Sequence, residues 1–182
     1  QATFIETARF ALAEVTPAVT RFLGDALVHV SRFHALVEHA NPSNIIMRPQ
    51  LTDTQRTISE FVAEVMHDGD TLQIGAGKIS AAFAAADVLH DFKDLGWHSE
   101  ATFPAIIDLV QTGVITGARK SLDRGKAVAV SFHGSPEQMA WMAGNPRFEV
   151  RTPEYVHNLR TIAGQDNMVA INAALAIDLT GQ

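Results

Sequence analysis

Residues after Thr52 alternate between two kinds of hydrophobic spacing, and this alternation restricts the fold more than any other feature of the sequence. Apolar residues recur every three or four positions between 54 and 66, which predicts an amphipathic helix with Thr52 or Asp53 as its N-cap. Short apolar segments and further helix-like segments then follow one another. The predicted strands are 71–75, a short one ending at Glu100, 126–132 and 168–179 (strand or hairpin), and the predicted helices are 79–91, 104–113, 135–144 and 158–163. Such alternation predicts an α/β fold, in which helices pack against a sheet.

The first part of the chain has shorter apolar segments separated by turn residues. We expect strands at 9–15, 26–30 and 34–39, with a turn containing proline and glycine between the first two. The stretch HANPSNIIMRPQLTD follows, with two prolines, two asparagines and no hydrophobic period. This composition is typical of a connection between two structural units.

Composition excludes several classes of function. The chain has 182 residues, of which 47% are hydrophobic, so it can bury a sizeable core. It has no cysteine, and its apolar runs are too short or too interrupted to cross a bilayer, so we expect a cytoplasmic protein without a membrane partner. The net charge is −6 with scattered lysines and arginines, so we expect no nucleic-acid partner. The histidines lack the spacing of metal ligands, so we predict no metal.

A glycine-rich stretch, IGAGKIS, joins the predicted strand 71–75 to the following helix. In an open parallel sheet, ligands bind where the carboxyl end of a strand turns into a helix. Gly75 and Gly77 allow close approach of the backbone to a ligand and unusual φ and ψ angles. Leu72 and Ile79 stand where a P-loop requires glycine and Ser or Thr, and Ser80 replaces the third glycine of a dinucleotide-binding turn. A binding loop and a simple tight turn both remain open.

Glu100 ends the next predicted strand, so its carboxylate and the glycine turn are expected at the same edge of the sheet. Carboxylates are normally ionised at neutral pH and can attack a thioester without a base. Such an attack needs close positioning and donors that stabilise the developing oxyanion. The structural alternative is that Glu100 caps the helix beginning near Phe103 or Pro104, and spacing alone favours that alternative. His98 shares the strand face of Glu100, and we interpret it as a structural histidine.

Five segments, in one order along the chain, carry a specific resemblance. They are AEVTP, GDALVHVS, DGDTLQIGAG, LGWHSEATFPAIIDLVQTGVITGARKSL and DNMVAINAALAIDLTGQ. They are similar to the stretches AEVNP, GDxxIHVS, DGxTLQxGIG, LGIHSEMxxDGxxDLxExGVITNxxK and NDNMVxINSAxEVDLTGQ of the acetyl-CoA hydrolase/transferase family. That family includes 4-hydroxybutyrate, butyrate, acetate and succinate CoA-transferases, and the resemblance covers almost the whole chain.

The resemblance implies a CoA-transferase-like (NagB/RpiA-like) open sheet with flanking helices. It places Glu100 on the family's catalytic glutamate and residues 75–77 on the neighbouring glycine loop, where the Ala76 amide would help to form the oxyanion hole. Coenzyme A is then a substrate. The candidate CoA-binding residues are Gly75, Gly77, Gly134, Ser135 and Asn158.

The implied reaction moves CoA between an acyl-CoA and a small carboxylic acid through a glutamyl-CoA thioester on Glu100. Acetyl-CoA hydrolysis would intercept the same intermediate with water. In a non-catalytic CoA-binding module, Glu100 would only cap a helix. The resemblance also suggests a homodimer or higher oligomer.

Family members are about twice as long as this chain, as two related domains would require. We therefore predict that residues 1–48 end an N-terminal domain, 49–52 form a linker and 53–182 begin the C-terminal catalytic domain. A GGQxDF-like segment that completes the family's site is expected after Gln182, so this chain alone is expected to be inactive. The chain departs from the family pattern at Ser80, at Pro104 and Ala105, and at His157-Asn158.

Overall fold

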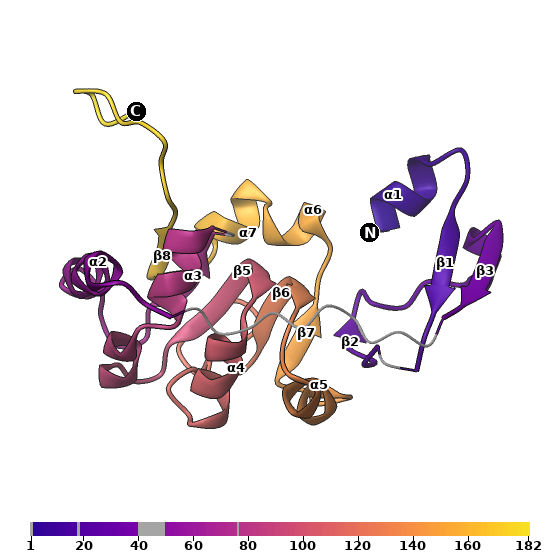
Figure 1. Cartoon of the computed structure of the whole chain (residues 1–182), viewed down its shortest axis with the longest axis horizontal. Helices are drawn as coiled ribbons and strands as arrows, with labels where there is room; N and C mark the ends of the chain where they lie inside the picture. The colour runs from indigo at the N-terminus through magenta and orange to yellow at the C-terminus, as the bar shows by residue number, and fades with distance from the viewer. Residues whose placement is uncertain (1, 18, 40–49, 76) are drawn as a thin grey trace.

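A computed structural model describes residues 2–17, 19–39, 50–75 and 77–182, and its main feature is a sheet of six parallel strands (Figure 1). Across the sheet the strands follow the order β2-β7-β6-β5-β4-β8, and each neighbouring pair is parallel. The strands are β2 (Leu23–Gly24), β4 (Thr71–Ile74), β5 (Gly96–Thr102), β6 (Ala127–Phe132), β7 (Phe148–Val150) and β8 (Met168–Ile171). The predicted α/β fold is confirmed.

Helices lie on both sides of this sheet, with α4 and α5 on one side and α6 and α7 on the other (Figure 1). The helices that follow the connecting segment are α2 (Asp53–Ala63), α3 (Lys78–Ala84), α4 (Pro104–Gln111), α5 (Pro136–Met142), α6 (Pro153–Val156) and α7 (Leu159–Ala163). Thr52 caps α2 in a capping box with Gln55, which confirms one of the two predicted N-caps. Because the strands are parallel, the helices return the chain to the same edge each time, so all carboxyl ends open together.

Four predicted elements differ from the structure. The strand predicted to end at Glu100 continues to Thr102 as β5. The predicted helix 79–91 is interrupted after α3, and a 3-10 helix, Asp87–Asp91, follows. The predicted strand 26–30 is wrong, because Gly24 has a φ of 91° and turns the chain out of the sheet directly after β2. Of the predicted strand or hairpin at 168–179, only β8 forms a strand.

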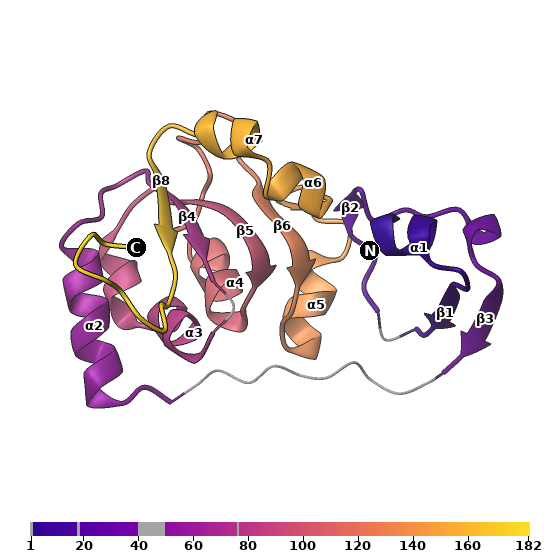
Figure 2. The ribbon, with the colours of Figure 1, turned by 90° about the horizontal axis from the view of Figure 1, so that it is seen from above.

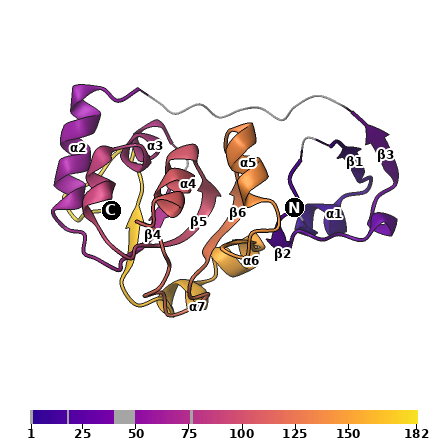
Figure 3. The same cartoon turned by 90° about the horizontal axis from the view of Figure 1, so that it is seen from below.

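Residues 2–38 contribute a second, smaller sheet, in which β1 (Leu12–Val15) pairs in parallel with β3 (Ala35–Glu38). α1 (Ala2–Thr7) and a 3-10 helix (Val30–Arg32) complete this region. Figures 2 and 3 show it beyond β2, at one end of the large sheet. β2 itself joins the large sheet, although it precedes the predicted domain boundary. The boundary stays a prediction.

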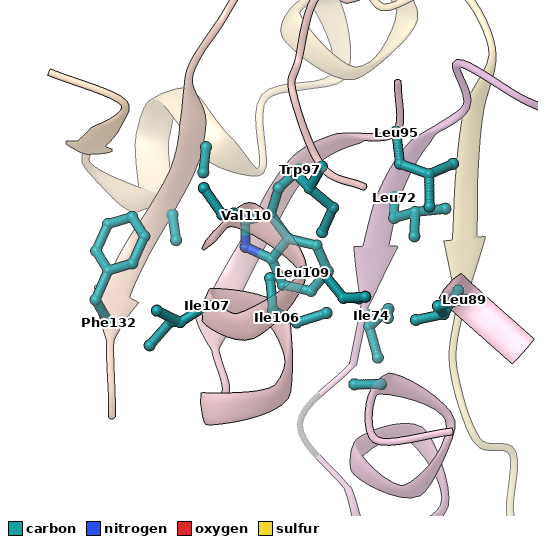
Figure 4. Close-up of a cluster of buried hydrophobic side chains, with 14 of the residues drawn as sticks. Leu72, Ile74, Leu89, Leu95, Trp97, Ile106, Ile107, Leu109, Val110 and Phe132 are labelled. Carbon is teal, nitrogen blue, oxygen red and sulfur yellow. The ribbon is translucent and has the colours of Figure 1, made fainter. Parts of the chain in front are cut away.

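The main core lies between the sheet and α4. Figure 4 shows Trp97 beside Ile106 and Leu109, with Leu72 and Ile74 nearby on β4. All five side chains are almost completely buried. The Trp97 indole N–H donates to Thr102 Oγ1 at 2.9 Å, so the ring is also satisfied as a donor. Burying side chains of this size contributes about 1.5–3 kcal/mol each, which makes β4 and β5 a rigid base for their carboxyl ends.

A buried lysine, Lys120, lies at the amino ends of the central strands β5 and β6. Lys120 Nζ donates to the carbonyl oxygens of Trp97 and Lys126, at 3.0 Å each, and so joins the amino ends of β5 and β6. A Cβ at Gly96 would lie 2.7 Å from Lys120 Cγ, which explains the glycine. Burial lowers the pKa of Lys120 to about 8.

Candidate functional site

Glu100 lies near the carboxyl end of β5 and is exposed, whereas the three residues before it are fully buried. β6 lies on one side of it, where Ser99 pairs with Ala129 and Ala101 with Ser131. The N-cap of α4 is Phe103, and no side chain caps that helix. The alternative in which Glu100 caps α4 is therefore wrong. Its carboxylate stands at the open edge of the sheet.

The glycine turn, residues 75–77, follows β4, the other neighbour of β5. The Gly75 amide donates to the Ile171 carbonyl oxygen at 2.9 Å, and a Cβ at Gly75 would lie 2.2 Å from Asn172 Oδ1. Only glycine fits there without a shift of Asn172. Close approach of this backbone to a ligand stays a prediction. Neither glycine uses the positive φ that its residue type allows, and the φ of Gly77 is −159°.

Asn172 fixes the turn from the β8 side. Its Nδ2 donates to Gln73 Oε1 at 2.8 Å, and Gln73 Nε2 donates to Asn172 Oδ1 at 3.3 Å. The two amides therefore pair side by side across β4 and β8. This pairing holds the Asn172 side chain against Gly75.

Ser99 fixes the turn from the β5 side. Its hydroxyl accepts from the Ile74 amide at 3.3 Å and donates to the Ile74 carbonyl at 3.0 Å. Ser99 is fully buried and directly precedes Glu100, as Ile74 directly precedes Gly75. One serine thus joins the strand that carries the carboxylate to the strand that carries the glycine turn.

His98 is buried under α6, as expected for a structural histidine. Its Nε2 donates to the Val156 carbonyl oxygen at 3.0 Å, and the Tyr155 ring lies 6.2 Å away between centroids. Nδ1 is buried without a hydrogen-bond partner. Burial lowers the pKa of His98, so the ring is neutral at pH 7.

A cavity of about 350 Å³ lies at the carboxyl ends of β6 and β7, between these strands and residues 19–28. Its wall begins at Val130, on the strand next to Glu100, and includes the predicted site residue Gly134. More than half of its lining residues are apolar: Val19, Phe22, Ala26, Leu27, Val28, Val130, Phe132, Met139, Val150 and Pro153. Burial lowers the pKa of His133, which lies 3.2 Å from Ser131 Oγ in the same wall, and so favours its neutral form; the charged residues of the lining are Arg21, Asp25 and Arg151.

An ion-pair network holds residues 19–28 against the sheet. The Arg151 guanidinium lies 2.8 Å from Glu149, 3.6 Å from Asp123 and 3.7 Å from Asp25. It also stacks over the Tyr155 ring at 4.9 Å. Tyr155 donates to Asp123 Oδ2 at 2.8 Å, and its burial raises its pKa to about 12. Arg151 thus shares its charge among three carboxylates of the protein.

The structure brings only part of the predicted set together. Glu100 lies near the carboxyl end of β5, Gly75 and Gly77 follow the neighbouring β4, and Gly134 follows β6 on the other side. Ser135 and Asn158 use their side chains as the N-caps of α5 and α7. Ala76 lies outside the described residues.

Two residues of this edge, Ser99 and Asn172, were not singled out from the sequence. Ser99 is a polar residue in the middle of β5 and Asn172 directly follows the apolar β8, and a polar residue in or next to an apolar strand was the available signal. Within the described ranges no group of three or more histidines and carboxylates is placed to hold a metal ion. Over the same ranges no helix combines the length and the apolarity needed to cross a bilayer.

Comparisons with known proteins agree with the resemblance found in the sequence. Residues 134–182 match the family model described as the acetyl-CoA hydrolase/transferase C-terminal domain. The chain is 37% identical to the 4-hydroxybutyrate coenzyme A transferase of Clostridium kluyveri, over 97% of this chain and 41% of that protein. The predicted resemblance is thereby confirmed.

Solved structures are similar over almost the whole chain. A crystal structure of RipA from Yersinia pestis is 35% identical, with a TM-score of 0.85, over 98% of this chain and 41% of that one. The 4-hydroxybutyrate CoA-transferase of Porphyromonas gingivalis is 31% identical, also with a TM-score of 0.85, over 96% and 44%. The chain therefore spans less than half the length of these relatives.

Proposed function

We propose that this relative of the CoA-transferases in the acetyl-CoA hydrolase/transferase family supplies the nucleophile of an acyl-CoA:carboxylate CoA-transferase. One observation carries the proposal: the exposed Glu100 and Gly75 lie near the carboxyl ends of adjacent strands, which the Ser99 hydroxyl joins through Ile74. A carboxylate beside closely packed backbone is suited to attack a carbonyl whose oxygen the backbone stabilises.

The proposed reaction has two halves. A Glu100 oxygen attacks the thioester carbonyl carbon, the C–S bond breaks, and CoA leaves as the thiolate that holds the electron pair. The thiolate attacks the glutamyl carbonyl of the mixed anhydride, which releases the donor carboxylate and leaves a glutamyl-CoA thioester. An acceptor carboxylate then reverses these steps, forming a new acyl-CoA and regenerating Glu100. No proton, metal or redox partner is required.

The roles of the neighbouring residues follow from this chemistry. Each attack places negative charge on a carbonyl oxygen, and we assign the Ala76 N–H as one donor to it, in line with the family resemblance. Because Gly75 and Gly77 have no side chains, they would leave room for the thioester between the turn and Glu100. The other donor and most CoA contacts would come from sequence that the longer relatives have and this chain does not span, with residues 1–48 and 53–182 belonging to two domains.

The cavity beside β6 is the proposed acyl subsite. It begins on the strand next to Glu100, is lined mainly by apolar side chains and has the size of a small-molecule pocket. Arg151 is already shared among Glu149, Asp123 and Asp25, so it is poorly suited to bind a second substrate carboxylate. The cavity therefore favours short apolar acyl groups, and Gly134 would contact them.

Hydrolysis is the second candidate activity, since Glu100 is exposed and water can reach any intermediate formed on it. Both activities use the same nucleophile. Acetyl-CoA formed from added acetate indicates transfer, whereas free CoA formed without an acceptor indicates hydrolysis. We place the reaction in the cytoplasm and in a homodimer or larger assembly.

The decisive experiment traps the intermediate in the full-length gene product. The protein is incubated with butyryl-CoA, reduced with borohydride and mapped by mass spectrometry. We expect the Glu100 carboxyl to be converted to an alcohol, and we expect no conversion in Glu100→Gln. Glu60→Gln, an exposed glutamate on α2, is the matched control and should behave like the wild type. CoA binding without modification of Glu100 would refute covalent catalysis and support a binding module.

A further inference from the structure

The backbone pairing between β4 and β5 stops before the strands end. Thr71 pairs with Gly96 and Leu72 with Trp97, and no later pair forms between these strands. Continued in the same register, Ile74 would face Ser99 and Gly75 would face Glu100. The strands instead separate at this point, and Ser99 reaches Ile74 with its side chain.

The Ser99 hydroxyl makes the two hydrogen bonds that the backbone of Ile74 would otherwise make with the backbone of a neighbouring strand. It accepts from the amide and donates to the carbonyl of the same residue, so both backbone groups of the fully buried Ile74 stay satisfied. A backbone-to-backbone ladder would draw the strands to their usual spacing of about 4.8 Å. With a side chain between them, the strands remain apart without leaving unpaired polar groups.

We infer that Ser99 is a positioning residue that sets the width of the gap between Gly75 and Glu100. This role rests on the proposed function, because the gap matters only if a thioester carbonyl enters it. The position of the gap supports the role, since Gly75 and Glu100 are the next residues on the two strands. Ser99 contacts neither substrate nor the reacting atoms; it acts through Ile74.

On the side of β4 that faces β8, several contacts hold the strand in place, whereas the Ser99 hydroxyl is the contact with β5 at Ile74. Gly75 is bonded to the Ile171 carbonyl and lies against Asn172, which is paired with Gln73. β4 is therefore held firmly to β8. Loss of the Ser99 contact would change the separation of β4 and β5 and leave β4 and β8 together.

The test compares Ser99→Ala with Ser59→Ala in the full-length protein. Ser59 is also a buried serine whose hydroxyl donates to a backbone carbonyl, that of Gln55 at 2.8 Å, but it lies on α2. The readout is the single-turnover rate of Glu100 modification by butyryl-CoA. Misplacing a reacting group by about 1 Å costs on the order of 10²-fold in rate, so we expect a loss of that order in Ser99→Ala and less than about threefold in Ser59→Ala.

Ser99→Thr keeps the hydroxyl and should recover most of the rate, and CoA affinity should change little in all three variants. If Ser99→Ala does not fold, a folded Ser99→Thr with near wild-type rate still supports the role, and a folded but slow one overturns it. A wild-type rate in Ser99→Ala overturns the positioning role alone. Absence of Glu100 modification in the wild-type protein overturns the proposed function itself, and the positioning role with it.

Discussion

Gly75→Ala is expected to destabilise the glycine turn strongly, whereas Gly77→Ala is not. A Cβ at Gly75 would lie 2.2 Å from Asn172 Oδ1, about 1.2 Å short of ordinary contact, which begins at 3.4 Å. At Gly77 the nearest atom is Ser80 Oγ at 4.0 Å. The two glycines are two residues apart, so they form a matched pair for separating steric contact from general effects of the substitution.

The size of the destabilisation depends on which groups the added methyl group displaces. Overpacking costs about 1–3 kcal/mol, and a shift of the Asn172 side chain breaks its 2.8 Å bond to Gln73, worth about 1 kcal/mol. We expect a loss of about 2–4 kcal/mol for Gly75→Ala. Gly77→Ala should be close to neutral, because a weaker N-cap, costing about 0.5 kcal/mol, is offset by a less flexible unfolded chain, worth about 0.4–1 kcal/mol.

Native-state hydrogen exchange measures the local stability of the glycine turn in each variant. The amide of residue 75 donates to the Ile171 carbonyl at 2.9 Å, so its protection reports the free energy that holds the turn to β8. Asn172→Ala removes the clashing oxygen, and in that background the cost of Gly75→Ala should fall to less than half. An equal cost in both backgrounds, or an equal loss in Gly77→Ala, would refute the steric explanation.

Two further predictions concern the buried lysine and the cavity. The pKa of Lys120 is lowered from 10.5 to about 8, so the unfolded chain binds more protons between these pH values and stability rises with pH across this window; Lys120→Met should remove that rise in a series of Tm measurements, and an unchanged pH dependence would contradict it. Leu27→Trp, in the cavity wall, should lower kcat/KM for butyryl-CoA up to about tenfold more than for acetyl-CoA, whereas Leu36→Trp on β3 should affect both substrates alike. Equal losses with both acyl-CoAs in Leu27→Trp would remove the cavity from the proposed acyl site.

The order of strands and helices was predictable because each element has its own local pattern. Alternation of strand-like and helix-like segments along the chain predicted the α/β fold. Thr52 predicted the start of α2, because its capping partner Gln55 is only three positions away. Local patterns failed where a distant contact decides the outcome. Residues 26–30 have the composition of a strand, but Gly24 turns the chain away after bonding to β7.

The candidate site shows the same division. Glu100 was found by its place at the end of an apolar strand and by the family resemblance. Ser99 and Asn172 could not be found in this way, because their importance lies in contacts with Ile74 and Gly75, which are 25 or more positions away. A serine in a strand has no local pattern that reveals which neighbouring backbone it will bond.

The pairing of Gln73 with Asn172 joins residues 99 positions apart, and this separation has a consequence for how the protein matures. During synthesis, at about 5–20 residues per second, the strand that carries Gln73 leaves the ribosome seconds before its partner exists. Contacts of such long range form late because the intervening loop must first be closed. Newly made chains should therefore acquire their hydrophobic core before Gly75 reaches its final place, so slow assembly of β8 would yield molecules that are folded by most spectroscopic measures but in which Gly75 is not yet held against β8.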